Sequence, residues 1–203
     1  MILVLATNNP GKVREIEKTL NLPRLRIRSL RDFPELPEVM EDGQTFLENA
    51  FKKARACSRA TGHAALADDS GLEVDFLDGA PGIYSARFSG DEATDEANNR
   101  KLLSLLAGVP QEKRSARFVC QMVLYLTDGT WIQTEGFCPG IIAAAPRGEQ
   151  GFGYDPVFYL PELGRTMAEL TLEEKNRISH RAQALEKIRA HLWRIQNTKG
   201  QRV

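Results

Sequence analysis

The first thirty residues constrain the fold more than any other stretch of the chain. Residues 2–6, "ILVLA", are continuously apolar, as in a strand that is buried on both faces. The polar turn "TNNPGK" follows, and apolar residues then recur at helical spacing over 13–20, with Pro10 in the first turn, where proline is tolerated. Residues 25–30, "LRIRSL", alternate as in a second strand. A strand, a helix and a second strand in this order predict an α/β fold built around a sheet.

Helices and strands continue to alternate along the rest of the chain. The expected elements are a helix from Thr45 to near Gly62, a glycine-containing loop over 79–90, a helix ending at Gly108, a hairpin of residues 116–126 and 130–137, and a helix that Thr171 and Glu174 cap together. We expect Ser179 to cap or kink that last helix, and a polar tail to begin at about residue 196. No linker divides the chain, so residues 1–203 are predicted to form a single domain with two lobes around one sheet.

Composition argues against several classes of partner. Lys and Arg together number 27, as do Asp and Glu, so a general attraction to nucleic acid or to an anionic membrane is not indicated. No run approaches the roughly 18 apolar residues that a membrane span needs, and the apolar start is expected to be a strand rather than a signal peptide. Three cysteines without a Cys-x-x-Cys pair favour a reducing cytoplasm over a disulfide framework or a zinc site.

The turn "TNNPGK" has the components of a phosphate-binding loop. Backbone N–H groups at a helix start point outward, the helix dipole favours an anion, and Lys12 adds a full positive charge. It is not a Walker A loop, because Ala6 stands where the first glycine belongs and Val13 stands where Ser or Thr would bind magnesium. The other interpretation is an ordinary helix cap beside a solvated lysine, and these residues alone leave both open.

Two adjacent carboxylates, Asp68 and Asp69, lie in "ADDSG" between two apolar runs, and the pattern predicts a turn there. Mg²⁺ takes one or two carboxylates and completes its shell with water and substrate phosphate. Without a metal, one member of such a pair would have a raised pKa. The alternative is an Asx turn with both carboxylates in solvent. Glu41, in "MEDG", is a third acidic candidate on a loop.

Three further stretches carry side chains that suit a nucleotide, although each also has an ordinary structural interpretation. The lysine pair at 52–53 adds cations to a helix but could be a solvated face. The turn "FGYDP" (152–156) joins aromatic rings to an acid, and the rings could stack on a base or belong to the core. The stretch 173–184 could be a charged helix surface, or could present Lys175, His180 and Arg181 to a ligand. Taken together, these are the groups that a nucleoside triphosphate with Mg²⁺ would need.

Several long motifs, in order, make the sequence resemble the inosine triphosphate pyrophosphatase family, also called XTP/dITP diphosphatases. They are "ATNNPGKVREI", "TFLENAFKKA", "ALADDSGLEVDFLDGAPGIYSARFSG" and "GFGYDPVFYLPELGRTMAELTLEEKNRISHRAQAL". The resemblance implies an elongated α/β fold with a long mixed sheet, a substrate cleft between two lobes, and a homodimer. It also implies Mg²⁺-dependent hydrolysis of ITP, dITP, XTP or dXTP to the monophosphate and pyrophosphate, which removes deaminated purines from the nucleotide pool.

The resemblance assigns roles by position. Glu41 and Asp69 would bind Mg²⁺, and Asp69 would also accept the proton of the attacking water. The implied substrate-binding residues are Thr7, Asn8, Asn9, Pro10, Gly11 and Lys12 for the triphosphate, Lys53, Ser70 and Lys175 for phosphate or sugar, and Phe152, Gly153, Tyr154, Asp155, His180 and Arg181 for the base.

Two positions depart from the family's pattern. Asn8 stands where the family commonly has glycine, and asparagine tolerates a left-handed backbone better than most residues. Asp42 follows Glu41 where the family often has threonine, which adds a nearby negative charge and leaves the choice of metal ligand open.

Other functions remain alternatives at this point. A related pyrophosphatase could act on modified pyrimidine or methylated nucleotides, and a nucleotide-sensing module could bind without turnover. A nucleic-acid-binding module fits least well, because the net charge is zero and no basic stripe is present.

Overall fold

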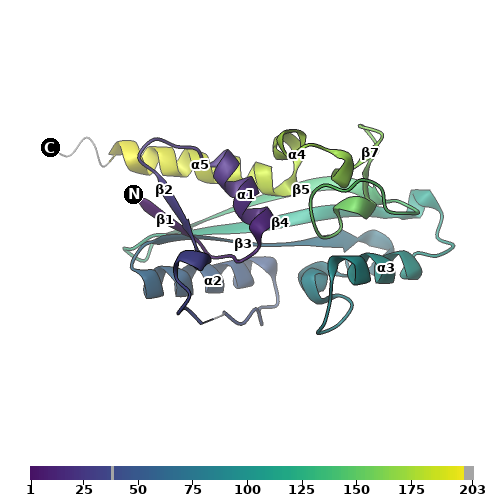
Figure 1. The fold of residues 1–203 in the computed structure, drawn as a ribbon, viewed down its shortest axis with the longest axis horizontal. Helices are drawn as coiled ribbons and strands as arrows, with labels where there is room; N and C mark the ends of the chain where they lie inside the picture. The colour runs from purple at the N-terminus through teal and green to yellow at the C-terminus, as the bar shows by residue number, and fades with distance from the viewer. Residues whose placement is uncertain (38, 199–203) are drawn as a thin grey trace. The chain divides into compact units, whose positions relative to one another are not determined.

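Residues 1–37 and 39–198 are described by the structure, a computed structural model that contains a seven-stranded sheet in the order β2-β1-β3-β4-β5-β6-β7 (Figure 1). The strands are β1 (Ile2–Leu5), β2 (Arg26–Ser29), β3 (Ala64–Val74), β4 (Ser115–Tyr125), β5 (Trp131–Ile142), β6 (Phe158–Leu160) and β7 (Arg165–Thr166). β1 pairs in parallel with β2 and β3, whereas β6 is antiparallel to β5 and β7. The predicted mixed α/β sheet is therefore confirmed.

Several helices begin or end at the capping residues that the sequence indicates, although the helix expected to end at Gly108 ends at Leu105. They are α1 (Pro10–Thr19), α2 (Phe46–Thr61), α3 (Asp95–Leu105), α4 (Leu172–Ile178) and α5 (His180–Thr198). Thr45 caps α2 by accepting from the backbone N–H of Glu48, and Gly62 ends the helix in the left-handed conformation. Ser179, in an extended conformation, separates α4 from α5, as expected of a residue that caps or kinks the helix.

Two further predicted boundaries are wrong. β5 continues to Ile142 rather than ending at 137, because Gly140 leaves room beside β6: a Cβ there would lie 2.6 Å from the ring of Phe158. α5 remains helical to Thr198, beyond the expected start of the polar tail at about 196, and residues 199–203 lie outside the described part of the chain. None of the helices within 1–37 and 39–198 combines the length and apolarity that a membrane span requires.

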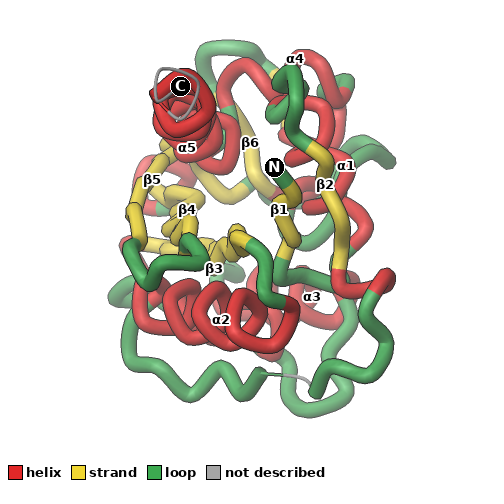
Figure 2. Tube along the Cα trace, turned by 90° about the vertical axis from the view of Figure 1, so that its left-hand side faces the viewer, coloured by secondary structure: helices red, strands yellow, loops and turns green. Residues whose placement is uncertain are grey.

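The chain divides into two compact units, and strands β3, β4 and β5 contribute residues to both. The first unit comprises residues 1–69, 120–136 and those from 181 onward. Its core has two parts: Leu3 and Leu5 of β1 pack with residues of α1 and α5, whereas Val4 and Ala6 pack with residues of α2. The apolar run at the start of the chain is buried on both faces because helices cover both faces here (Figure 2).

The second unit comprises residues 70–119 and 137–180, and it has a core of its own. Leu102 of α3 packs there with Leu72 of β3, and Phe118 of β4 packs against Phe158 of β6 with ring centroids 4.3 Å apart. The predicted loop over 79–90 contains a short 3₁₀ helix, Gly82–Arg87, on this unit.

A pH-dependent contribution to stability is expected at α4. The Glu174 carboxylate accepts from Arg165 at 2.8 Å and from the backbone N–H of Thr171 at 2.8 Å, and these bonds lower its pKa from 4.5 to about 2. Because the folded-state pKa lies below the unfolded one, the stabilisation is present above about pH 4.5 and is lost as the pH falls towards 2. Urea unfolding should show wild type more stable than Glu174→Gln at pH 7, with the difference shrinking below pH 4.5. A difference that stays constant across this range would contradict the assignment.

Candidate active site

Asp68 and Asp69 lie within strand β3, not on a turn as predicted. The strand continues through both residues to Val74, and the two side chains are only 2% and 7% exposed, so the solvated Asx turn is also wrong. Neighbouring residues of a strand point to opposite faces of the sheet. The two carboxylates are therefore directed towards different helices, and each has its own set of positive partners.

Asp68 faces α1 and α5. Its Oδ2 lies 3.0 Å from Nζ of Lys12 and 3.2 Å from Nη2 of Arg181, while Nη1 of Arg181 lies 2.6 Å from Oε2 of Glu15. Burial alone would raise the pKa of Asp68, but the charges of Lys12 and Arg181 outweigh it and hold the pKa well below its usual range. Asp68 is thus an ionised partner of two cations, which gives it a structural place in the site.

Asp69 faces α2. Its Oδ2 accepts a hydrogen bond from Nδ2 of Asn49 at 3.0 Å, and its Oδ1 lies 3.6 Å from Nζ of Lys53. Burial raises the pKa of Asp69, and the negative charge of Glu41 raises it further, while Lys53 acts in the opposite direction. A buried carboxylate with a raised pKa is a better proton acceptor than an exposed one, since its anion is less stabilised.

Lys53 joins Asp69 to Glu41. Its Nζ lies 2.9 Å from Oε2 of Glu41, so one ammonium group holds two carboxylates together. The neighbouring Asp42 instead pairs with Lys52 at 2.7 Å on the surface. The departure at Asp42 is therefore separated from the cluster by its own ion pair, and Glu41 is the carboxylate directed towards Asp69.

Two members of this cluster were missed by sequence reasoning. Asn49 donates to Asp69 and accepts from the backbone N–H of Gly43 at 2.8 Å, so it fixes the loop that carries Glu41 against α2. Its spacing of four residues from Lys53 on one helix is a signal that could have found it. Glu15 follows Lys12 by three residues, and its burial next to Arg181 could not be read from that spacing.

The start of α1 also lies in the first unit. Oδ1 of Asn9 accepts from the backbone N–H groups of Gly11 and Lys12 at 2.8 and 3.1 Å, with Pro10 at the first helical position. Asn9 therefore caps the helix as expected, but Lys12 is not the solvated lysine of that interpretation, because it pairs with Asp68 and its side chain is only 17% exposed. Phosphate binding at this turn stays a prediction. Thr7 contributes by accepting from the backbone N–H of Asn9 at 3.2 Å, and Asn8 is exposed.

The predicted base-binding turn lies in the second unit and is fixed by a buried ion pair. Nζ of Lys175 lies 2.5 Å from Oδ2 of Asp155 and 4.6 Å from the centre of the Phe152 ring. The same Asp155 oxygen accepts from the backbone N–H of Phe152 at 2.9 Å. Tyr154 is buried and donates its hydroxyl to the backbone oxygen of Ser85, and burial raises the pKa of that phenol.

His180 and Arg181 are adjacent in sequence but lie in different units. The imidazole of His180 stacks on the ring of Phe118, with centroids 4.8 Å apart and planes at 18°. The Nε, Nη1 and Nη2 atoms of Arg181 each donate to a carboxylate, so the structure shows an ion-pairing role for this residue. Donation from either residue to a base stays a prediction.

The predicted residues therefore fall into two groups. The first unit brings together Lys12, Glu41, Lys53, Asp69 and Arg181, next to the turn of Thr7, Asn8, Asn9, Pro10 and Gly11; the second unit contains Ser70, Phe152, Gly153, Tyr154, Asp155, Lys175 and His180. When Glu15 and Asp68 are added to the first group as ion-pair partners, four carboxylates (those of Glu15, Glu41, Asp68 and Asp69) face three cations (Lys12, Lys53 and Arg181), leaving one net negative charge when all are ionised.

Gly151 should be required for the conformation of the turn at residues 152–155. Its φ is +81°, and a Cβ there would collide with the carboxylate of Asp155. We expect Gly151→Ala to displace Asp155 and to lower the free energy of unfolding by about 1–3 kcal/mol, measured by urea denaturation. Gly79→Ala is the matched control, since Gly79 has φ +86° with no atom near the added Cβ. Equal losses of free energy of unfolding in both variants would show that the cost arises from the left-handed backbone alone and not from the collision with Asp155.

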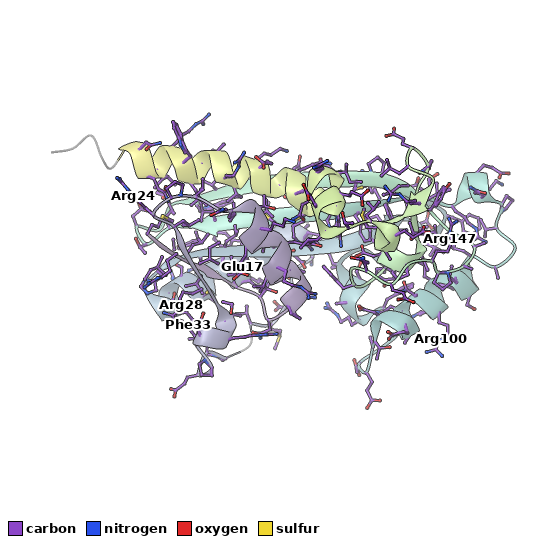
Figure 3. All side chains as sticks on the ribbon, turned by 45° about the horizontal axis from the view of Figure 1, so that its top comes forward. Glu17, Arg24, Arg28, Phe33, Arg100 and Arg147 are labelled. Atoms are coloured by element: carbon purple, nitrogen blue, oxygen red, sulfur yellow. The ribbon has the colours of Figure 1, made fainter. Side chains whose placement is uncertain are left out.

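A cavity of about 410 Å³ in the second unit includes none of the predicted site residues. Its arginines are Arg114 and Arg147, of which Figure 3 labels Arg147. Arg114 donates to three backbone carbonyls, those of Leu106, Val109 and Ala143, and the guanidinium of Arg147 lies over the ring of Tyr159 at 5.1 Å. We interpret Arg114 as a residue that ties the end of α3 to β5.

Comparison with known proteins identifies the family. The model of the Ham1 family matches residues 3–191. The chain belongs to the Ham1 family. The dITP/XTP pyrophosphatase of Desulforamulus reducens is 54% identical over 96% of this chain and 97% of the relative. The dITP/XTP pyrophosphatase of Geobacter sulfurreducens is 55% identical over 94% of this chain and 96% of the relative.

Solved Ham1 structures share the fold. A HAM1 protein from Coxiella burnetii superposes with a TM-score of 0.87 at 41% identity, covering 96% of this chain and 99% of that protein. The Ham1 protein of Staphylococcus aureus gives a TM-score of 0.84 at 41% identity, covering 95% of this chain and 98% of that protein. The mixed sheet and its flanking helices are therefore those of the Ham1 family.

Proposed function

We propose that this chain hydrolyses the non-canonical purine nucleotides ITP, dITP, XTP and dXTP to the monophosphate and pyrophosphate. Two relatives, at 54% and 55% identity over nearly the full chain, carry the name dITP/XTP pyrophosphatase. The chain is accordingly a hydrolase of the nucleoside triphosphate pyrophosphatase class. The structural observation that supports the proposal most directly is the buried Asp69, joined through Lys53 to Glu41.

The cluster fits a magnesium ion. Glu41 and Asp69 converge on one ammonium group, and the pKa of Asp69 is raised mainly by burial, with a smaller contribution from the negative charge of Glu41. The described residues hold no group of three or more His, Cys, Asp or Glu side chains arranged to bind a metal. Two carboxylates suit Mg²⁺, which is usually held by one or two carboxylates together with substrate phosphate.

We assign Glu41 and Asp69 as the side chains that would hold Mg²⁺. When bound, the ion would supply positive charge that offsets the charge developing on the leaving pyrophosphate. Asp68 is assigned no such role, because its Oδ2 already has Lys12 and Arg181 as partners.

The residues of the first unit can perform the remaining steps. Release of pyrophosphate requires attack of water at the α-phosphorus, and Asp69 accepts the proton of that water. Lys12, Lys53 and the positive end of α1 stabilise the negative charge on the leaving group, which is the main requirement of phosphoryl-type transfer. The negative charge of Asp68 restrains the ammonium of Lys12 at 3.0 Å, so Lys12 is oriented before substrate binds.

Selection of the base follows from hydrogen-bond polarity. Hypoxanthine and xanthine have an acceptor oxygen at position 6, where adenine has a donor amino group. A donor facing that position would be left unpaired by adenine, which costs roughly 1–3 kcal/mol, or about tenfold to a hundredfold in preference for each contact. We propose that donors of the second unit's turn or of His180-Arg181 make this contact. Guanine keeps the 6-oxygen, so its 2-amino group has to be rejected by shape or by an opposing donor.

A substrate panel tests the proposal. The purified protein is incubated with dITP, XTP, ATP and GTP in the presence of Mg²⁺, and phosphate is resolved from pyrophosphate. We expect pyrophosphate as the primary product and faster turnover of dITP and XTP. Inorganic phosphate as the primary product, or faster turnover of ATP, would refute it, and binding without turnover would favour the sensing module. A homodimer stays a prediction from the resemblance, and a cytoplasmic location stays a prediction from the three cysteines.

A further inference from the structure

Helix α3 contacts the base-binding turn of the second unit through two side chains on one face. Nδ2 of Asn99 donates to the backbone oxygen of Gly153 at 2.9 Å, and Oδ2 of Asp95 accepts from the backbone N–H of the same residue at 2.6 Å. Positions four apart on a helix lie on the same face, so one face of α3 forms hydrogen bonds with both the N–H and the carbonyl of Gly153. Gly153 has φ +63°, and its two hydrogen bonds fix the direction of the chain on either side of it.

The neighbouring residues of the turn are also fixed. Phe152 is held through its backbone N–H by Asp155, Asp155 is held by Lys175, and Tyr154 reaches the backbone oxygen of Ser85 at 2.8 Å. The same helix holds the stretch beyond Ser85, since Asn98 donates to the backbone oxygens of Ser85 and Ala86. The turn is therefore preorganised at each residue from 152 to 155.

Asn99 has a feature that packing does not explain. It is only 8% exposed, and its Oδ1 atom has no hydrogen-bond partner among residues 1–37 and 39–198. A buried acceptor without a partner is unfavourable, so the unpaired Oδ1 offsets part of the stability that the Nδ2 hydrogen bond to Gly153 contributes. The hydrogen bond from Nδ2 of Asn99 to the Gly153 carbonyl is the contact that explains an amide side chain at this position.

We propose that Asn99, assisted by Asp95, is a positioning residue that sets base selection by holding the Gly153 peptide. The inference rests on the proposed function, in which the turn from Phe152 to Asp155 contacts the base. Discrimination against a single extra amino group requires the site to be held to within a fraction of an ångström. A Gly153 peptide released from α3 would leave the turn free to accommodate the 2-amino group of guanine.

The experiment compares kcat/KM for dITP and dGTP, with Mg²⁺, in wild type, Asn99→Ala and Asp95→Ala. Arg100→Ala is the matched control, because Arg100 is an exposed neighbour on α3 (Figure 3). We expect the dITP:dGTP ratio to fall roughly fivefold to tenfold in Asn99→Ala, as for the loss of one hydrogen bond that orients the site. It should fall by a smaller factor in Asp95→Ala, whose side chain is exposed, and stay unchanged in Arg100→Ala.

The ratio separates positioning from stability, because a lower fraction of folded enzyme reduces both rates equally. Thermal unfolding of each variant is measured alongside, and Asn99→Ala should change Tm little, since the lost hydrogen bond is offset by removal of the unpaired acceptor. If Asn99→Ala does not fold, Asp95→Ala decides the question. An unchanged ratio in the folded variants would overturn the inference and leave the proposed function intact. A wild type that turns over ATP faster than dITP would instead overturn the proposed function, and this inference with it.

Discussion

Asp69→Asn is expected to lower kcat for dITP by roughly 10²–10⁴-fold, the usual contribution of a positioned proton acceptor. The amide keeps the size of the carboxylate but cannot take a proton from water. It also removes a negative charge next to Lys53 and Glu41, so binding of the triphosphate should persist. Single-turnover rates and equilibrium binding of dITP, measured on the same preparation, separate the two effects.

Asp42→Asn is the matched control for this experiment. Asp42 is next to Glu41 in sequence, but its side chain is 60% exposed and pairs with Lys52 at the surface. Its replacement should leave turnover near that of wild type. If Asp69→Asn retains a near-normal rate, Asp69 is not the proton acceptor proposed here. If it loses dITP binding as completely as turnover, the loss reports the role of Asp69 in holding Mg²⁺ and substrate rather than proton transfer.

Arg181→Met is expected to lower the free energy of unfolding by about 3–5 kcal/mol, because it leaves two buried carboxylates without their shared cation. The Arg181 side chain is 2% exposed, and the side chains of its partners Glu15 and Asp68 are 3% and 0% exposed. Methionine preserves much of the apolar volume, so the loss reports the charge rather than a cavity. For a chain of this size the change corresponds to a fall in Tm of about 6–20 °C.

Arg177→Met provides the comparison. Arg177 also pairs with a glutamate, Glu173, but the two side chains are 70% and 65% exposed, and an exposed pair of this kind contributes little. Its replacement should change the free energy of unfolding by no more than about 0.5 kcal/mol. Similar small effects for both variants, measured by urea denaturation at neutral pH, would show that the buried triad is not a major source of stability.

Much of the fold could be read from local patterns. The apolar run at 2–6 predicted a strand buried on both faces, and Thr45, Gly62, Thr171 and Ser179 marked helix boundaries, because capping depends on residues within one turn of each other. Errors arose where the decisive contact was distant. β5 passes through Gly140 because the ring of Phe158 packs there, which no local signal at 137–142 reveals.

The same division applies to the candidate site. The sequence by itself determined the family, through motifs in order, and the chemical types present: adjacent carboxylates, lysines on two helices, and an aromatic turn. It predicted a turn at Asp68 and Asp69, because two adjacent acids between apolar runs are seldom buried without partners.

Only the tertiary structure supplied those partners. Arg181 reaches Asp68 across 113 residues and Glu15 across 166. Arg181 beside Asp68 and Lys53 beside Asp69 make burial of the two adjacent carboxylates possible. The alternation of a β-strand then directs Asp68 towards α1 and α5, and Asp69 towards Asn49 and Lys53 of α2. The pKa of Asp68 is lowered and that of Asp69 is raised because folding brings different charges and different burial to the two faces of the strand. The order of residues alone does not contain that information.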